Sequence, residues 1–311
     1  MKRYLLILAL AQSLAASAGD FGQIYEWGIN IVGRNNAMTI TDARLLTANS
    51  DWSMVLRMDG SLFAWGSNTY GQTNVPSGNH FRHCHAGWHH GIAATTNGTV
   101  VEWGIPFGKE IDTWERLRPT ITNAIRVAAG DDHSAALLAD GTVLAWGGRS
   151  AVTNRSGTIR DAMQIDSGWY HLVVLHSNGT VSAFGQASQP NQYFDPPAGL
   201  SNVVRVVASQ FASYAIKSDG TLVAWGMPDT YGQMTPPAGQ SFIDVAGGRD
   251  HTIALRSDGT VILWGDNKQE QLVVPPSLDQ VRVTHVAAGR YHSLAIRRVV
   301  GPPTNLRVVN P

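Results

Sequence analysis

The chain has 311 residues, enough for one large domain or two of ordinary size. Lysine plus arginine and aspartate plus glutamate number 23 each, so the formal net charge is zero. This balance argues against nucleic acid as a partner, because a protein that binds nucleic acid needs a basic face to neutralise phosphates.

The N-terminus has the pattern of an export signal. Lys2 and Arg3 precede an apolar stretch, and a small-residue cleavage site lies directly before Gly19. The apolar stretch is short for a membrane span, and no later segment approaches the length of one. We therefore expect residues 1–18 to be a signal peptide and the mature protein to be periplasmic, on the cell surface or extracellular.

The rest of the chain repeats one formula. A Trp-Gly pair, with Phe-Gly in one copy, occurs seven times at intervals of 38 to 43 residues. A segment such as AAGDDHS (128–134) precedes the pair, and an Asp-Gly or Asn-Gly hairpin turn of two residues is expected between them. The flanking runs are almost continuously apolar, which is typical of strands buried on both faces. A unit of this length matches one blade of a β-propeller.

We therefore predict an all-β fold over residues 19–298, a seven-bladed β-propeller of four-stranded antiparallel blades. The chain begins with a Trp-Gly half unit and ends with the complementary half at 285–296. We expect these N- and C-terminal segments to share one blade, which closes the circle and removes two sheet edges. The aromatic residues of the seven pairs should fill the cores between blades. Residues 299–311 are expected to be a tail or the start of a linker.

The best copies, HTIALRSDGTVILWGDNKQEQLVVPP (251–276) and SYAIKSDGTLVAWGMPDTYGQMTPP (213–237), resemble the regulator of chromosome condensation repeat family. The resemblance implies a seven-bladed propeller. It is nearest to the compact repeats of secreted bacterial members, which include a propeller-type β-lactamase inhibitory protein. The repeat histidine is replaced at Trp52 and Ala212, and the Asn-x-Tyr-Gly-Gln loop is lost after Trp103 and Trp146, where we expect surface insertions.

Function should lie on the face that carries the Gly-x-x-His loops and the segments after Trp-Gly. Aromatic and arginine residues on these loops predict a protein-binding surface, because such residues dominate interface hot spots. The alternative is that the rings only cover the inner strands. The predicted binding residues are Trp52, Trp88, His89, Trp169, Tyr170, Phe211, Tyr291, Arg249 and Arg290.

Histidine occurs in two patterns. Five histidines share one register of the repeat, and we expect them to be structural hydrogen bonders, because a repeated position answers a repeated geometric need. In HFRHCHAGWHH (80–90), a zinc or copper site would use His83, His85 and His89. The usual ligand spacings are absent, and alternation along a strand turns Cys84, the sole cysteine, to the other face. We expect no metal, no other cofactor and no internal disulfide.

The sequence contains no Gly-x-Ser-x-Gly elbow, phosphate loop or calcium loop. Glu26 and Glu102 are acid–base candidates only if the fold brings them together, and we expect them exposed at blade edges. The leading hypothesis is an exported, monomeric, non-enzymatic scaffold that binds a protein, an enzyme target being one option. Two alternatives stay open. One is a cell-envelope propeller that binds or hydrolyses polysaccharide, and the other is the guanine-nucleotide exchange factor that the family resemblance implies, which export disfavours.

Overall fold

The computed structural model describes residues 21–29, 33, 37–105, 119–185, 194–226, 229–278 and 282–299. The expected signal peptide and the tail beyond residue 299 lie outside these ranges, as does most of the expected insertion after Trp103 (106–118). Within the described ranges, no helix is both long and apolar enough to cross a membrane.

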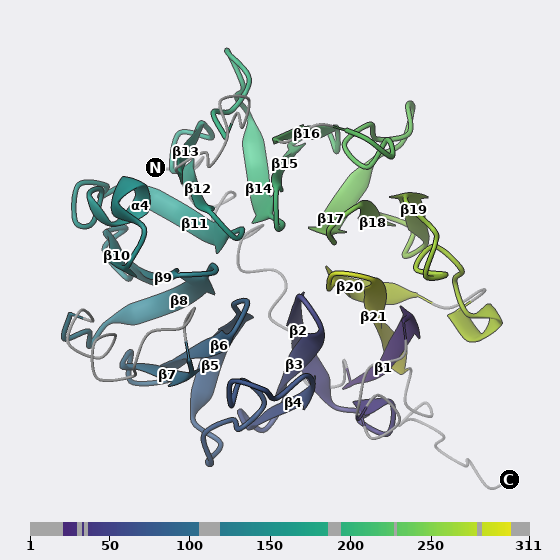
Figure 1. The fold of residues 1–311 in the computed structure, drawn as a ribbon. Coiled ribbons are helices and arrows are strands. Elements are labelled where there is room, and N and C mark those ends of the chain that lie inside the picture. Colours follow the sequence, from purple (N-terminus) through teal and green to yellow (C-terminus); the bar gives the residue numbers. More distant parts are fainter. Residues whose placement is uncertain are drawn as a thin grey trace, which may run out of the picture.

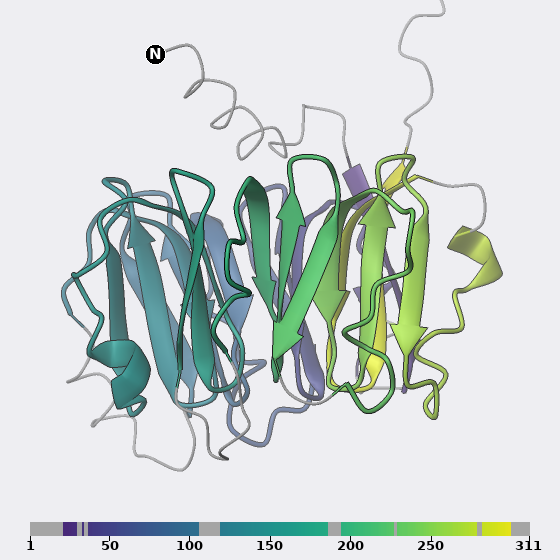
Figure 2. The same ribbon diagram turned by 90° about the horizontal axis from the view of Figure 1, so that it is seen from above.

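The described residues form seven antiparallel sheets of three strands each. Figure 1 shows the sheets set around a common axis, with the first strand of each unit nearest the centre, and Figure 2 shows them from the side. From inner to outer strand the sheets are β2 (Ala43–Asn49), β3 (Trp52–Arg57) and β4 (Leu62–Gly66); β5 (Phe81–Ala86), β6 (His90–Thr95) and β7 (Val100–Gly104); β8 (Ala124–Ala129), β9 (His133–Leu138) and β10 (Val143–Gly147); β11 (Ala162–Ser167), β12 (His171–His176) and β13 (Val181–Gly185); β14 (Val203–Ala208), β15 (Ala212–Lys217) and β16 (Leu222–Gly226); β17 (Phe242–Gly247), β18 (His251–Arg256) and β19 (Val261–Gly265); β20 (Val283–Ala288), β21 (His292–Val299) and β1 (Phe21–Gly28).

The two ends of the described chain meet in the last of these sheets. Strand β1 pairs along its whole length with β21, with Trp27 opposite Ser293. The first strand is therefore the outer strand of the sheet that the last two strands begin. The predicted shared sheet is confirmed, and the circle is closed by backbone hydrogen bonds rather than by an end-to-end contact.

Within the part of the chain that the structure describes, each sheet has three strands where four were expected, as the segment after β4 illustrates. Residues 67–80 contain turns and no strand. The backbone N–H of Tyr70 donates to the side-chain oxygen of Gln72 (2.9 Å), and Gly71 has a φ of 75°. Pro76 then removes a backbone donor, which disfavours a further strand.

The hairpin turns also differ from expectation. At Asp140-Gly141 the connection has three residues, because Leu138 and Thr142 still pair through the Leu138 N–H (2.8 Å). Only Gly141 has a positive φ (84°), while the Asp140 carboxylate accepts the N–H of Thr142 (2.9 Å). The turn signal was correctly located, but the turn is the longer type in which a single glycine takes the left-handed position.

The apolar core consists of seven clusters, each between two neighbouring sheets. Every cluster contains one aromatic residue of the seven repeat pairs, as predicted. A buried aromatic side chain removes about 150–250 Å² from water, or about 4–6 kcal/mol before entropy costs. The predicted insertion after Trp146 adds to one cluster, because Val152 on the short helix α4 (Ser150–Thr153) is fully buried there. The one-turn 3₁₀ helix η1 spans Pro276–Leu278.

The indole N–H groups show how neighbouring units are joined. Trp103 donates to the carbonyl of Gln72 (2.8 Å) in the preceding Tyr-Gly-Gln loop, and other copies do the same. Trp225 donates to the Phe194 carbonyl (2.8 Å), and in two other units a glutamate takes the place of the carbonyl. Trp65 donates to Glu26 (2.9 Å) and Trp146 to Glu102 (3.2 Å). Glu26 is only 2% exposed, so its expected place on the surface was wrong.

Candidate binding face

One face of the molecule carries the predicted binding loops. His133 pairs with Gly147, so the loop before β9 and the segment after β10 emerge side by side. We call this side the loop face; its Gly-x-x-His-type loops are residues 50–51, 87–89, 130–132, 168–170, 209–211, 248–250 and 289–291. The opposite side, formed by the Asp-Gly and Asn-Gly turns, is the hairpin face.

Backbone hydrogen bonds join successive loops around the axis. Trp88 donates to Gly130 (3.1 Å), Asp131 donates to Trp169 (3.0 Å), and Trp169 donates to Gln210 (3.2 Å). On the other side of the circle, Arg290 donates to Ser50 (2.7 Å). These loops therefore hold one another in place, and their side chains project from a fixed frame.

The repeat histidines fasten each sheet to the next, as expected for structural hydrogen bonders. The Nε2 atom of His171 lies 2.8 Å from the hydroxyl of Ser213 on the following sheet. His90, His133, His251 and His292 make equivalent contacts with serine hydroxyls at 2.8–3.2 Å. The motif glycine is required by close packing, since a Cβ on Gly168 would lie 2.3 Å from the His171 ring.

Two sheets lack the histidine and make the same junction in another way. Ala212 takes the histidine position on β15, and Tyr214 of the same strand bonds to the hydroxyl of Thr252 (2.8 Å). On β3 the position is occupied by Trp52, whose indole donates to the Gly87 carbonyl (2.9 Å). Trp52 is fully buried, so it is not available to a partner and is removed from the predicted binding residues.

Burial favours the neutral form of four of these histidines. Desolvation lowers the pKa of His90 and of His171 to about 3, and that of His251 to about 4. It also lowers the pKa of His133, although the Asp132 carboxylate acts in the opposite direction. A neutral imidazole shares one hydrogen bond with a hydroxyl without burying a charge.

A continuous row of aromatic rings crosses one sector of the loop face. Tyr70 packs on His89 (4.1 Å between ring centroids), and Trp88 lies between His89 (4.8 Å) and Trp169 (4.1 Å). The two indoles are stacked almost parallel, at 3°. The edge of Phe211 then meets Trp169 at 4.8 Å. The structure thus brings together residues that are up to 141 positions apart (70 and 211) in the chain.

Trp169 fixes this row to the opposite side of the axis. Its indole N–H donates to the side-chain oxygen of Asn49 (2.9 Å), and the Asn49 amide donates to the Ala86 carbonyl (3.2 Å). Trp169 is only 6% exposed, so its main role is to support its neighbours. Trp88, His89, Tyr170 and Phe211 are partly exposed and form the accessible part of the row.

A charged group borders the row. Arg149 bonds to Asp132 (3.0 Å) and lies over the Tyr170 ring, with its guanidinium carbon 4.7 Å from the centroid. Asp131 is 3% exposed, and desolvation together with Asp132 raises its pKa to about 7. Burial, followed by the charge of Asp131, also raises the pKa of Tyr170.

The remaining predicted residues form a separate polar group. Arg249 donates to the Tyr291 hydroxyl (2.8 Å) and lies 3.3 Å from Asp250. The guanidinium of Arg290 sits over the Tyr291 ring at 4.8 Å. The side chains of Arg249, Arg290 and Tyr291 are all partly exposed.

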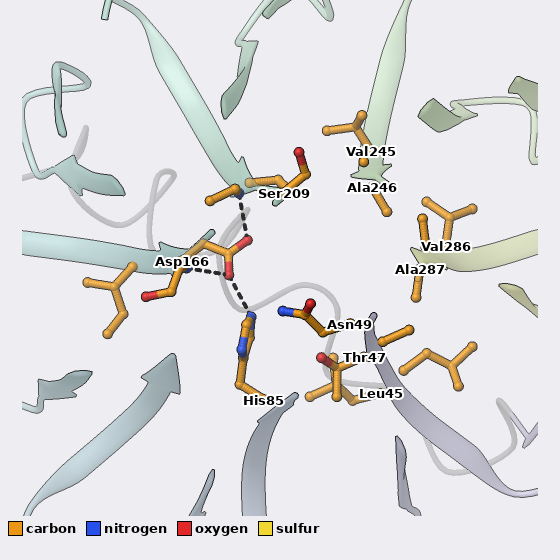
Figure 3. A pocket seen from close by; sticks show the side chains of 18 of the residues that line it. Leu45, Thr47, Asn49, His85, Asp166, Ser209, Val245, Ala246, Val286 and Ala287 are labelled. Atoms are coloured by element: carbon orange, nitrogen blue, oxygen red, sulfur yellow. Dashed lines mark hydrogen bonds and ion pairs between the residues drawn. The ribbon is translucent and has the colours of Figure 1, made fainter. Parts of the chain in front are cut away.

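The histidine-rich strand β5 does not assemble a metal centre. His83 and His85 accept backbone N–H groups of β8, and His85 lies 2.8 Å from Asp166 (Figure 3). His89 instead belongs to the aromatic row, and Cys84 is buried in a core cluster, on the other face of its strand as predicted. Among the described residues, no group of three histidine, cysteine or acidic side chains is placed to hold a metal.

The sequence analysis did not single out the two tyrosines of the Tyr-Gly-Gln loops. Tyr70 is 36% and Tyr231 41% exposed, which makes them the most accessible aromatic side chains of the described residues. Lys268 donates to the Tyr231 hydroxyl (3.0 Å). The sequence did offer a signal for their exposure, because each is a large aromatic residue in a polar turn and directly precedes a glycine.

Comparisons with known proteins agree with this fold. The regulator of chromosome condensation (RCC1) repeat model matches residues 124–150 and 242–271. Protein pim1 of Schizosaccharomyces pombe is 27% identical over 163 residues, which cover 47% of this chain and only 27% of pim1. Prp20p of Saccharomyces cerevisiae, whose crystal structure was described together with its binding to Gsp1p and histones, has a TM-score of 0.72 at 16% identity, over 92% of this chain and 93% of its own.

A plant receptor shares the architecture more distantly. The ectodomain of the receptor kinase ACR4 of Arabidopsis thaliana has a TM-score of 0.56 at 20% identity, over 71% of this chain and 78% of its own. At these identities the structural likeness establishes a propeller fold of the RCC1 type and nothing about the ligands.

Proposed function

Since the chain carries RCC1 repeats on a propeller fold, we propose that it is a non-enzymatic scaffold that binds a protein through its loop face. The observation that carries the proposal is the continuous aromatic row from Tyr70 to Phe211. Aromatic side chains offer large contact areas at a low entropy cost, and they dominate binding hot spots.

The rigidity of the face supports this role. The loops are linked by backbone hydrogen bonds, and Trp169 is held from two sides by Trp88 and Asn49. A surface that is ordered before binding does not lose that conformational freedom on association. The glutamates considered for acid–base work serve the junctions instead, since Glu26 and Glu102 each accept an indole N–H.

The experiment is affinity capture with matched variants. Trp88→Ala removes the centre of the row, while Ile243→Ala removes an apolar side chain on the hairpin face that is 45% exposed. A protein captured by the wild type and by Ile243→Ala, but lost with Trp88→Ala, supports the proposal. With that protein purified, Trp88→Ala should weaken binding by at least 2 kcal/mol, or about 30-fold. Equal capture by all three proteins would exclude this face.

The proposal has two further parts, which are that the protein is exported and that its binding inhibits an enzyme. The pattern before Gly19 supports export, and N-terminal sequencing of the mature protein should then begin at Gly19. The resemblance to inhibitory propellers supports an enzyme as the bound protein. The turnover of the captured enzyme should therefore fall when the wild type is added, but not with Trp88→Ala.

A further inference from the structure

The inner strands enclose a cavity on the axis of the molecule, with a volume of about 140 Å³. Figure 3 shows that its walls differ in character. His85 and Asp166 point toward each other on one side, and Ala246 and Ala287 lie across from them. A cavity of this size, half polar and half apolar, is large enough for a small molecule and too small for a folded segment of another protein.

Asp166 lines this cavity, and both of its carboxylate oxygens already have hydrogen-bond partners. Asp166 lies 2.8 Å from the Nε2 atom of His85 and accepts the backbone N–H groups of Ser167 and Ala208, both at 2.9 Å. These contacts use both carboxylate oxygens. Asp166 therefore already has its own hydrogen-bond partners.

Arginines gather at the end of the cavity toward the hairpin face. Arg205 and Arg126 line the wall from the third position of their inner strands, and Arg205 is paired with Asp244 (2.6 Å). Arg126 makes no side-chain hydrogen bond or ion pair with any described residue. Exposed Arg82, at the start of β5, is close enough to add to the repulsion felt by Arg126.

The charge balance of this end is positive. Burial, and then the charge of Arg205, lower the pKa of Arg126, while Asp166 acts in the opposite direction. His83 lies near Arg126, and His285 lies near Arg205 and Asp244; burial lowers the pKa of both histidines. Arg205 is paired with Asp244, whereas Arg126 has no ion-pair partner among the described residues, so this end keeps an excess positive charge that an anion beside Arg126 would offset.

We propose that this end of the axial cavity binds a small oxyanion, a carboxylate or a phosphate, between Arg126 and Arg205, with the charge of Arg82 nearby. A guanidinium presents parallel N–H donors that match the paired oxygens of such groups. The site lies at the opposite end from the aromatic row, so it does not depend on the function proposed for the loop face.

The test is an NMR titration of the full chain with sodium phosphate and, separately, sodium acetate, at constant ionic strength. At least one anion should give saturable shifts that are concentrated on the inner strands β5, β8 and β14. A stronger response to phosphate identifies a phosphoryl ligand, and a stronger response to acetate identifies a carboxylate. Arg126→Gln should weaken binding about tenfold or more. Arg160→Gln, which changes an exposed arginine near the Asp140 turn, should leave it unchanged.

Two outcomes overturn the proposal. One is that neither anion gives saturable shifts with the wild type. The other is that a folded Arg126→Gln variant binds as tightly as the wild type. If Arg126→Gln does not fold, Arg82→Gln decides instead, because Arg82 is exposed, makes no hydrogen bond or ion pair with a described residue and adds positive charge near Arg126; binding should then weaken at least threefold. Unchanged binding in Arg82→Gln would count against the site.

Discussion

Acid should unfold this protein through its junction histidines. In the folded state the pKa values of His90 and His171 are about 3 and that of His251 about 4, against 6.5 in the unfolded chain. Below pH 6.5 these histidines therefore become protonated in the unfolded chain but stay neutral in the folded chain, which lowers the free energy of unfolding. Lowering the pH from 7 to 5 costs about 1.9 kcal/mol for each histidine, or about 6 kcal/mol for the three.

Asp131 acts with the opposite sign. Its folded-state pKa of about 7 lies above the ordinary 3.8, so the folded protein takes up a proton that the unfolded chain does not. Over the same interval this stabilises the fold by about 2 kcal/mol, which leaves a net loss of about 3–4 kcal/mol. That is a large fraction of the 5–15 kcal/mol typical of a folded domain.

The assay is guanidinium denaturation at pH 7, 6 and 5, with the free energy of unfolding as the readout. Asp131→Asn removes the stabilising contribution, so its loss between pH 7 and 5 should rise to about 6 kcal/mol. A stability that changes by less than about 1 kcal/mol in the wild type would refute the assignment of neutral, buried histidines. A smaller loss in Asp131→Asn than in the wild type would refute the sign given to Asp131.

Two further substitutions test the junctions at pH 7. Tyr214→Phe should lower the free energy of unfolding by about 0.5–1.5 kcal/mol, because it removes one buried hydrogen bond and leaves the Thr252 hydroxyl with only its bond to the Gln233 carbonyl, whereas the exposed Tyr231→Phe should change it by less than about 0.5 kcal/mol. Equal effects of the two would contradict the junction role. Glu26→Ala should destabilise more than Glu26→Gln in the same measurement, because a glutamine oxygen can still accept the Trp65 indole N–H, and equal losses would show that this bond contributes nothing.

The closed circle could be predicted because its signals are local and repeated. The Trp-Gly pairs and the turns recur at nearly constant spacing, and two unmatched half units at the chain ends leave a shared sheet as the simplest completion. In the structure these half units pair as strands β1 and β21, with Trp27 opposite Ser293. The fourth strand was expected only because a unit of about 40 residues has room for four short strands, whereas residues 67–80, which include a Tyr-Gly-Gln loop, form turns.

The binding face was predicted less completely because it depends on contacts across the axis. Nothing in the sequence pairs Trp88 with Trp169, or Trp169 with Asn49, which are 81 and 120 residues apart. Trp52 could have been placed correctly, since it occupies the register of a histidine expected to be buried. Its aromatic character was weighed above its position in the repeat.

Position in the repeat is a better guide than residue type because each junction demands one hydrogen bond and not one particular side chain. Among the described sheets, all seven junctions have a bond from the middle strand to the next sheet, whether histidine to serine, Tyr214 to Thr252 or Trp52 to the Gly87 carbonyl. In the same way, Glu26 and Glu102 provide the hydrogen-bond acceptors that the indole N–H groups of Trp65 and Trp146 need. In a closed circle a single broken junction exposes two sheet faces, so compensation is required at every junction. The loops between junction positions are under no such constraint, which leaves residues such as Trp88 and Phe211 available for binding.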